Sequence, residues 1–309
     1  MAERMPRAHP QPTRPSALQI RTRDASRSYA GHMTDAALIG PVGAPDLHVM
    51  TYNIRRRFPH VRSGNPDQWA TRKELVRRIL AAEQPTLLCV QEALADQVAF
   101  VAQALGPRYR WVGLGRNPSA RGERCPIFYD SERLELTDWR QRALSATPDV
   151  IGSRTWGNLT RRIVVSAAFT DTATGARLLA WNTHFDHLSR RSRLESAAYI
   201  AALARAAGAA EPDAAIVVAG DINADVESAV VRRLTAGGVL RDAWEVATDR
   251  LTPQWGTFSN YRAPQRGGKR IDWILVSSGV TVDAVGINAV RVDGAAASDH
   301  EPVQALIRL

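Results

Sequence analysis

Lysine is nearly missing from this chain of 309 residues, although 40 of its residues are basic. Only Lys73 and Lys269 are lysines, so the formal net charge of +9 rests on arginine. Arginine makes bidentate contacts with phosphate, but heavy use of arginine and alanine is also typical of GC-rich genomes. The basic character is therefore only a weak indication of a polyanionic partner such as nucleic acid.

Cysteine and long apolar runs are also scarce, and each shortage excludes a class of protein. Cys89 and Cys125 are the two cysteines, and they indicate neither a disulfide framework nor a thiolate metal site. Cys89 lies in the apolar run 86–90, where we expect it to be buried as a small hydrophobic residue. No window approaches the roughly 18 to 20 apolar residues of a membrane span. We expect a soluble, cytoplasmic monomer with reduced cysteines.

The first 46 residues differ from the rest of the chain. They are rich in proline, arginine, serine and alanine, show no sustained periodicity, and lack the apolar core of a secretory signal. This composition predicts a disordered lead over 1–46. From residue 47 onward the patterns of strands and helices alternate, and a hydrophobic content of 45% is enough for a large core. We therefore predict one large domain over 47–309.

The stretch 215–223, with the sequence AIVVAGDIN, is the most informative part of the chain. Its apolar run predicts a fully buried strand, after which Asp221 and Asn223 are spaced to point the same way. Gly220 would allow a close backbone approach that a side chain would block. An alternative interpretation is that Asp221 and Asn223 only cap a following helix over 225–235.

Polar residues also mark the ends of the other predicted strands. They are Asn53 at the end of 47–53, Glu92 after 86–90, His184 after 178–183, Asp272 near the start of 271–276, and Asp299 with His300 before 303–309. If these strand ends share one edge of packed sheets, the polar groups converge on one concave site. Carboxylates and amides are oxygen ligands, which favours a hard cation such as Mg²⁺, with Mn²⁺ as a substitute.

Six short motifs follow one another along the chain: TYN, QE, NTHFDH, GDIN, RIDWILVS and SDHEPV. Together they resemble the endonuclease/exonuclease/phosphatase family, which includes deoxyribonuclease I, exonuclease III-type repair nucleases, CCR4-type deadenylases and inositol polyphosphate 5-phosphatases. The resemblance covers 47–309, which would be the catalytic domain. It implies an α/β fold, a four-layer sandwich of two packed mixed β-sheets flanked by helices, and this agrees with the predicted strands.

The resemblance also implies a metal site and a substrate pocket. Glu92 would be the principal Mg²⁺ ligand and Asp299 would reach the same ion. Asn53 would hold the ligand geometry or contact a phosphate oxygen. His187 would either shape the substrate pocket or only cap the helix that begins near Ser189.

The catalytic residues follow from the same resemblance. Asp221 and Asn223 would orient the attacking water and contact the scissile phosphate. His300, paired with Asp272, would act as base or phosphate partner, because a carboxylate fixes the ring and stabilises the imidazolium. His184 would donate to the phosphate or to the leaving oxygen. Whether Asp221 or His300 is the general base stays open at this point.

Arg55 is a departure from the family pattern, because exonuclease III-type repair enzymes carry an acid two residues after the first-motif Asn. This difference argues against abasic-site repair. In this respect the chain resembles the branch that holds CCR4-like and uncharacterised bacterial members. The stretch 64–73, which contains Trp69, is similar to the same branch. We predict that Arg55, Trp69 and Arg270 bind substrate at the rim, where aromatic and arginine side chains stack bases and contact phosphates. The alternative for each tryptophan is a place in the core.

Three functions remain open. The first is metal-dependent hydrolysis of a phosphodiester in nucleic acid or a nucleotide. The second keeps the fold and the chemistry but takes a small phosphoester, such as an inositol or sugar phosphate or a lipid headgroup. The third is a non-catalytic binding protein on the same fold, and it is disfavoured because no catalytic position is visibly lost.

Overall fold

The computed structural model describes residues 37–59 and 64–309. Most of the predicted lead lies outside these ranges, so its disorder stays a prediction. The last residues of that lead pack on the domain that follows. The backbone N–H groups of Leu38, Ile39 and Gly40 donate to the carboxylate of Glu83 at 2.7, 3.2 and 3.0 Å. The contacts of the domain therefore begin several residues before Leu47.

Within the described ranges, the strands form two mixed sheets. The seven-stranded sheet has the order β10 (Asp249–Arg250), β12 (Thr281–Ile287), β13 (Val303–Arg308), β1 (Leu47–Asn53), β2 (Leu87–Gln91), β4 (Ile127–Asp130) and β3 (Tyr109–Val112). The six-stranded sheet has the order β5 (Leu134–Ala143), β6 (Ile163–Asp171), β7 (Arg177–His184), β8 (Ala215–Asp221), β11 (Asp272–Ser277) and β9 (Leu240–Asp242). Parallel pairing of β1 with β2 and of β7 with β8 places the ends of these strands together.

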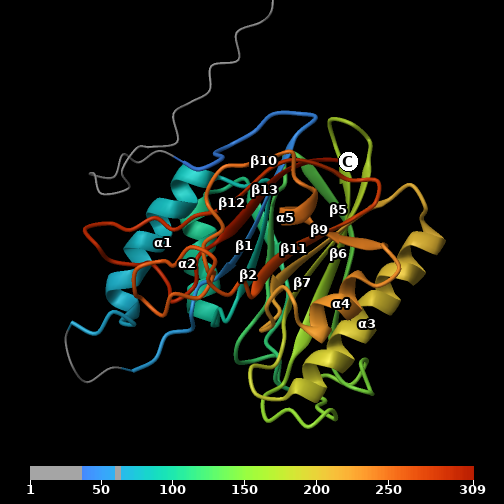
Figure 1. Cartoon of the computed structure of the whole chain (residues 1–309), viewed down its shortest axis with the longest axis horizontal. Coiled ribbons are helices and arrows are strands. Elements are labelled where there is room, and N and C mark those ends of the chain that lie inside the picture. Colours follow the sequence, from blue (N-terminus) through green and yellow to red (C-terminus); the bar gives the residue numbers. More distant parts are fainter. Residues whose placement is uncertain (1–36, 60–63) are drawn as a thin grey trace, which may run out of the picture. The chain divides into compact units, whose positions relative to one another are not determined.

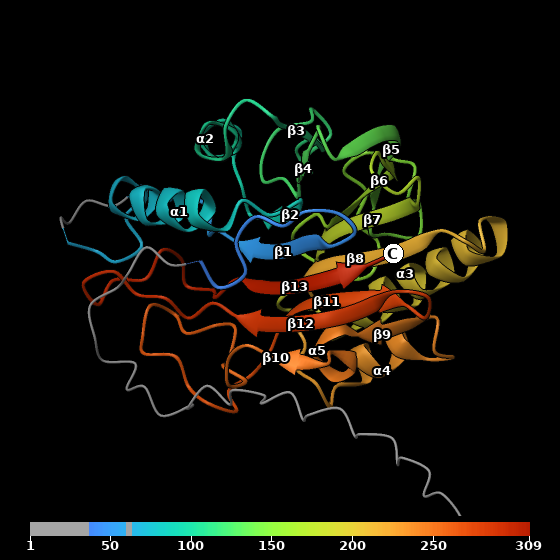
Figure 2. The ribbon, with the colours of Figure 1, turned by 90° about the horizontal axis from the view of Figure 1, so that it is seen from above.

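Helices cover the outer faces of both sheets, as Figures 1 and 2 show. The helices α1 (Trp69–Glu83) and α2 (Ala95–Leu105) lie on the seven-stranded sheet, and α3 (Arg190–Ala210) and α4 (Ala229–Thr235) lie on the six-stranded sheet. The short helix α5 (Ala243–Val246) follows β9. The predicted four-layer α/β sandwich is confirmed. No helix in the described ranges has the combined length and apolar character that crossing a bilayer requires.

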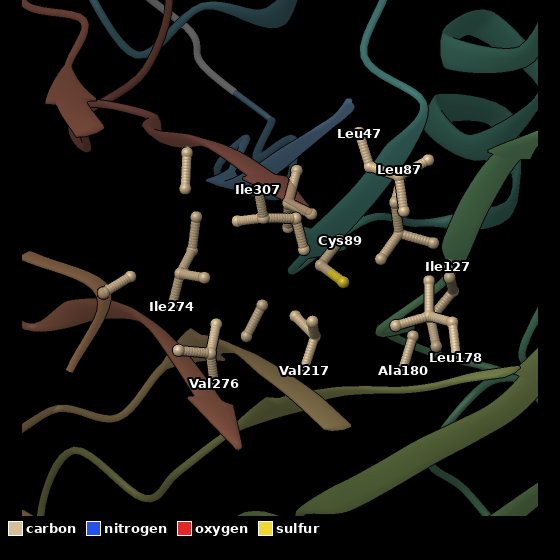
Figure 3. Close-up of a cluster of buried hydrophobic side chains, with 14 of the residues drawn as sticks. Leu47, Leu87, Cys89, Ile127, Leu178, Ala180, Val217, Ile274, Val276 and Ile307 are labelled. Atoms are coloured by element: carbon tan, nitrogen blue, oxygen red, sulfur yellow. The ribbon is translucent and has the colours of Figure 1, made fainter. Parts of the chain in front are cut away.

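The alternation of side chains along β8 and β11 explains why both faces of these strands are buried. Val217 on β8 and Ile274 on β11 belong to the core between the sheets (Figure 3), where Cys89 is also buried. Their neighbours Val218 and Trp273 point the other way and pack in the layer beneath α3 and α4. Because successive side chains of a strand point to opposite faces, an uninterrupted apolar run satisfies both layers. Packing on both faces thereby holds the ends of these two central strands in fixed positions.

Candidate active site

Three predicted catalytic residues lie side by side at one edge of the six-stranded sheet. His184 at the end of β7 pairs in register with Asp221 at the end of β8. Asp221 pairs in turn with Asp272 at the start of the antiparallel strand β11. Adjacent strands are about 4.8 Å apart, so the register alone brings this imidazole and these carboxylates together. All three residues are buried.

The seven-stranded sheet brings a second group of polar residues to the same place. Its centre is the side-chain amide of Asn53, at the end of β1. The Nδ2 atom of Asn53 donates to Glu92 Oε1 at 3.1 Å and to Asp221 Oδ2 at 3.1 Å, and it lies 3.4 Å from His300 Nε2. The Asn53 amide thus lies between Asp221 of the opposite sheet, Glu92 after β2, and His300 before β13. The predicted convergence of these residues is found in the structure.

His300 and Asp272 form a close pair. The Nδ1 atom of His300 lies 2.8 Å from Asp272 Oδ2, while its Nε2 atom lies 3.8 Å from Asp221 Oδ2. Burial alone would lower the pKa of His300, but the charge and the hydrogen bond of Asp272 raise this pKa well above its usual value. This environment favours the imidazolium form of His300, and the pairing predicted for Asp272 is present.

Asp221 has the opposite electrostatic character. Burial, followed by the neighbouring carboxylate of Asp272, raises the pKa of Asp221 to about 7, although His300 opposes this shift. A carboxyl group with such a pKa can take up and release a proton near neutral pH. His184 lies 3.4 Å from Asp221 Oδ2, and burial together with Arg162 and Arg116 lowers the pKa of His184 well below its usual value.

Unusual backbone conformations hold the ends of these strands. Gly220 has a φ of 147°, and a Cβ atom at this position would lie 2.0 Å from the carbonyl oxygen of Thr183 on β7. The predicted close approach is confirmed. Glu92 and Asn223 adopt left-handed conformations with φ of 62° and 50°, which non-glycine residues rarely do. Such conformations cost free energy and are typical of functional sites.

Asn223 is held beside the site rather than at its centre. Its backbone N–H donates to Asp221 Oδ1 at 2.9 Å, and its side-chain Nδ2 donates to the carbonyl oxygen of Phe185 at 3.0 Å. The alternative in which Asp221 and Asn223 cap the following helix is wrong, because Ser228 caps α4 through a hydrogen bond with Val231 N–H.

A hard cation fits the donor set of this site. Glu92 is a suitable ligand because its pKa is lowered: burial opposes the shift, but His300 and the N–H of Arg56 favour the carboxylate. A second set, Asp221, Asp272 and His300, offers ligand atoms within 4.8 Å of one another, and Asp272 Oδ1 makes no hydrogen bond to any described residue. The structure thus contains oxygen-rich groups able to hold a divalent metal.

Arg55 lies between the two acids predicted to bind that metal. Its Nε atom is 3.5 Å from Asp299 Oδ2, and its Nη1 atom is 3.9 Å from Glu92 Oε2. Burial raises the pKa of Asp299, while His300 opposes this shift. The guanidinium of Arg55 therefore neutralises part of the charge of the predicted metal ligands, in addition to any contact with substrate.

Arg270 is not a substrate-binding residue, and this prediction is corrected. Its side chain is buried, pairs through both Nη atoms with the carboxylate of Asp242, and stacks 4.0 Å from the ring centroid of Trp273. A substrate cannot reach it. Trp69 is partly buried and packs edge-on against Phe100 with ring centroids 5.5 Å apart, so the core alternative accounts for it as well as the rim does.

His187 does not cap α3, because Ser189 does so by accepting from Ser192 N–H. His187 is exposed, and its Nδ1 atom lies 3.0 Å from Arg162 Nη2. Beneath the site, Gln91 Nε2 donates to Asn182 Oδ1 at 2.8 Å and joins the two sheets. Sequence reasoning missed Gln91, Asn182 and Arg162; the signal for the first two is a polar residue inside an apolar strand.

The fold and the site define a member of the endonuclease/exonuclease/phosphatase class of hydrolases. The Endonuclease/Exonuclease/phosphatase family matches residues 50–300, and the chain belongs to this family, whose members act on phosphoester bonds. The search of curated proteins gave no match.

Solved structures from several organisms are similar to this chain. The mannosyl-6-phosphatase of Bacteroides thetaiotaomicron has 28% sequence identity and a TM-score of 0.78, covering 85% of this chain and 100% of its own. A family protein of Bacteroides vulgatus has 30% identity and a TM-score of 0.77, covering 85% and 99%. The human nocturnin catalytic domain with bound sulfate, at 17% identity, TM-score 0.66 and coverage of 85% and 94%, shares the fold.

Proposed function

We propose that the protein is a Mg²⁺-dependent hydrolase that cleaves a phosphoester bond by in-line attack of water. The observation that carries this proposal is the Asn53 amide, whose Nδ2 atom lies 3.1 Å from both Glu92 and Asp221 and 3.4 Å from His300. A carboxylate suited to a cation is thereby held next to an acid and an imidazolium suited to proton handling.

Glu92 and Asp299 are the proposed metal ligands, with Asn53 beside them. We prefer this set to Asp221, Asp272 and His300, because Asp272 Oδ2 and His300 Nδ1 are already paired with each other at 2.8 Å. A bound Mg²⁺ would neutralise charge on the non-bridging phosphate oxygens, and Mn²⁺ is the expected substitute.

The remaining residues have proposed roles that follow from their charges. Asp221, with a pKa of about 7, accepts the proton of the attacking water. His300, held as an imidazolium by Asp272, donates to a phosphate oxygen. His184 contacts Asp221 and, as a neutral imidazole, donates to the phosphate or the leaving oxygen. The backbone N–H of Asn223 orients the Asp221 carboxylate, and Asn223 contacts the phosphate of the bound substrate.

Two classes of substrate are candidates. The first is a phosphodiester of a nucleotide or nucleic acid, which is favoured by Phe258: its ring is 47% exposed and lies 4.9 Å from that of His300, where a base can stack. The second is a small sugar phosphate, which is favoured by the similarity to the mannosyl-6-phosphatase of Bacteroides thetaiotaomicron at 28% identity.

The test is a panel of oligonucleotides, nucleotides and sugar phosphates assayed with Mg²⁺, with Mn²⁺ and with a chelator. We expect hydrolysis with either metal, none with the chelator, and a loss of about 10² to 10⁴ in kcat for His300→Ala. Circular dichroism of that variant checks that it is folded. Activity that persists in chelator, or a folded His300→Ala protein with wild-type turnover, would reject the proposal. A KM that rises steeply with added salt identifies a polyanionic substrate.

A further inference from the structure

Arg162 is a buried cation whose hydrogen-bonding capacity is only partly used. It directly precedes β6, which pairs with β7, and its side chain is 3% exposed. Its Nη2 atom lies 3.0 Å from His187 Nδ1, and its Nε atom lies 3.5 Å from Asp186 Oδ2. Its Nη1 atom has no hydrogen-bond partner in residues 37–59 and 64–309. A buried donor without a partner is unfavourable, so a group that accepts from Nη1 would be bound there.

A small cavity adjoins Arg162 and is rich in positive charge. Its volume is about 10 Å³, and its charged lining consists of Arg116, Arg124, Arg161, Arg162, Glu92 and Glu123. Glu123 is already paired with Arg116 at 2.7 Å and with Arg56 at 2.9 Å. Burial lowers the pKa of Arg116, and the like charge of Arg162 adds to this shift. An anion at the cavity would offset this excess of positive charge.

The size of the cavity indicates how such an anion would bind. A volume of about 10 Å³ is close to the least that holds one water-sized group. It therefore has room for about one oxygen of an acidic group, beside His184 and Glu92, which also line the cavity.

The strand order separates this position from the site of hydrolysis. Across the sheet edge, Val164 of β6 pairs with Thr183 of β7, and His184 pairs with Asp221 of β8. The backbone before β6 is thus two strand spacings, about 10 Å, from Asp221. The lining of the cavity includes His184 and Glu92 but none of Asn53, Asp221, Asp272 and His300, so an anion there would lie beside the phosphate attacked next to Asp221.

We propose that Arg162, with Arg116 in the lining of the same cavity, binds a second phosphate of the substrate, next to the phosphate that is hydrolysed. The inference rests on the proposed function for the identity of the group beside Asp221. The second phosphate belongs either to a nucleotide chain or to a small bisphosphate. A merely structural Arg162 would hold Asp186 and His187 in place and would be indifferent to this phosphate.

The binding test uses methylenebisphosphonate and methylphosphonate, which are not hydrolysed, in titration calorimetry at one free Mg²⁺ concentration. We expect the wild type to bind the bisphosphonate at least about tenfold more tightly than the monophosphonate. Arg162→Met should remove this preference, and Arg162→Lys should keep part of it. Arg177→Gln, at the far end of β7 in an exposed ion pair with Glu211, is the matched control and should bind as the wild type does. A wild type without the preference, or a folded Arg162→Met protein that retains it, would overturn the proposal.

A kinetic test identifies the source of the second phosphate. Thymidine dinucleotides with and without a terminal phosphate, and hexose bisphosphate against hexose monophosphate, form the two pairs. The extra phosphate should lower KM by about 10- to 100-fold in one pair, and Arg162→Met should cancel this gain with little change in kcat. Hydrolysis in which neither pair shows the gain contradicts the subsite. Absence of hydrolysis with a retained bisphosphonate preference would remove the proposed function and leave the subsite standing.

Discussion

Replacing Asp221 with asparagine should stabilise the metal-free protein while strongly reducing its activity. Burial and the carboxylate of Asp272 raise the pKa of Asp221 from 3.8 to about 7 in the folded protein. The folded chain therefore holds a proton that the unfolded chain has already lost between about pH 4 and pH 7. The stability contributed by the protonated form is fully present below about pH 4 and is lost as the pH rises through 7.

The size of the effect follows from the pKa difference. The difference between 3.8 and about 7 corresponds to about 4 kcal/mol of free energy of unfolding at pH 8. We expect Asp221→Asn to recover about 2 to 4 kcal/mol, because the buried charge is gone while the amide oxygen can still accept from one of the two donors, Asn53 Nδ2 or Asn223 N–H. For a domain of this size the gain corresponds to a rise in Tm of about 5 to 15 °C. Activity should fall by about 10² to 10⁴.

Thermal unfolding in chelator, followed by circular dichroism at pH 5 and pH 8, measures this effect. Asp213→Asn is the control, because Asp213 is exposed just before the same strand. It should leave Tm unchanged at both pH values. The reasoning is refuted if Asp221→Asn is less stable than the wild type at pH 8, or if its advantage at pH 5 equals that at pH 8.

Two further substitutions test other parts of the site. Gly220→Ala places a Cβ atom 2.0 Å from the Thr183 carbonyl oxygen and should lower the free energy of unfolding in urea by about 3 kcal/mol or more. Gly208→Ala, where α3 has open space, is the control and should raise it by up to about 1 kcal/mol. Equal effects of the two substitutions would contradict the close approach. Arg55→Ala removes the cation beside Glu92 and Asp299 and should lower the Kd for Mn²⁺ in calorimetry about five- to tenfold, so an unchanged Kd would argue against these ligands.

The central strands and the site at their ends could be predicted from sequence because each signal is local. An apolar run that stops at a polar residue marks both the strand and its end, as in β1 and β8. Each of these strands begins at the first residue of its predicted run. The strand β12 was not predicted. Its sequence carries Asp283 at a register shift between Val282 and Ala284, and such a bulge breaks the alternation on which the pattern depends.

The errors at the site concern arginine, whose role depends on residues distant in sequence. Arg270 was expected at the rim, but its partner Asp242 lies 28 residues away on the short strand β9. Arg162 was missed for the same reason, since its burial arises from the loop after β7, which carries Asp186 and His187. A charged residue directly before an apolar strand is too common a pattern to distinguish a buried cation from an exposed one.

The amide of Asn53 lies on the seam between the sheets, with Glu92 on one side and Asp221 on the other. Neither half of the molecule carries a complete set of reactive groups, so the chemistry exists only while the halves are in contact. A chain cut in the exposed turn of residues 172–175, between β6 and β7, would leave Asn53 and Glu92 on one piece and Asp221 on the other, so each piece should be inert and turnover should return when the two are mixed. The seam would then serve as a built-in reporter of fragment reassembly.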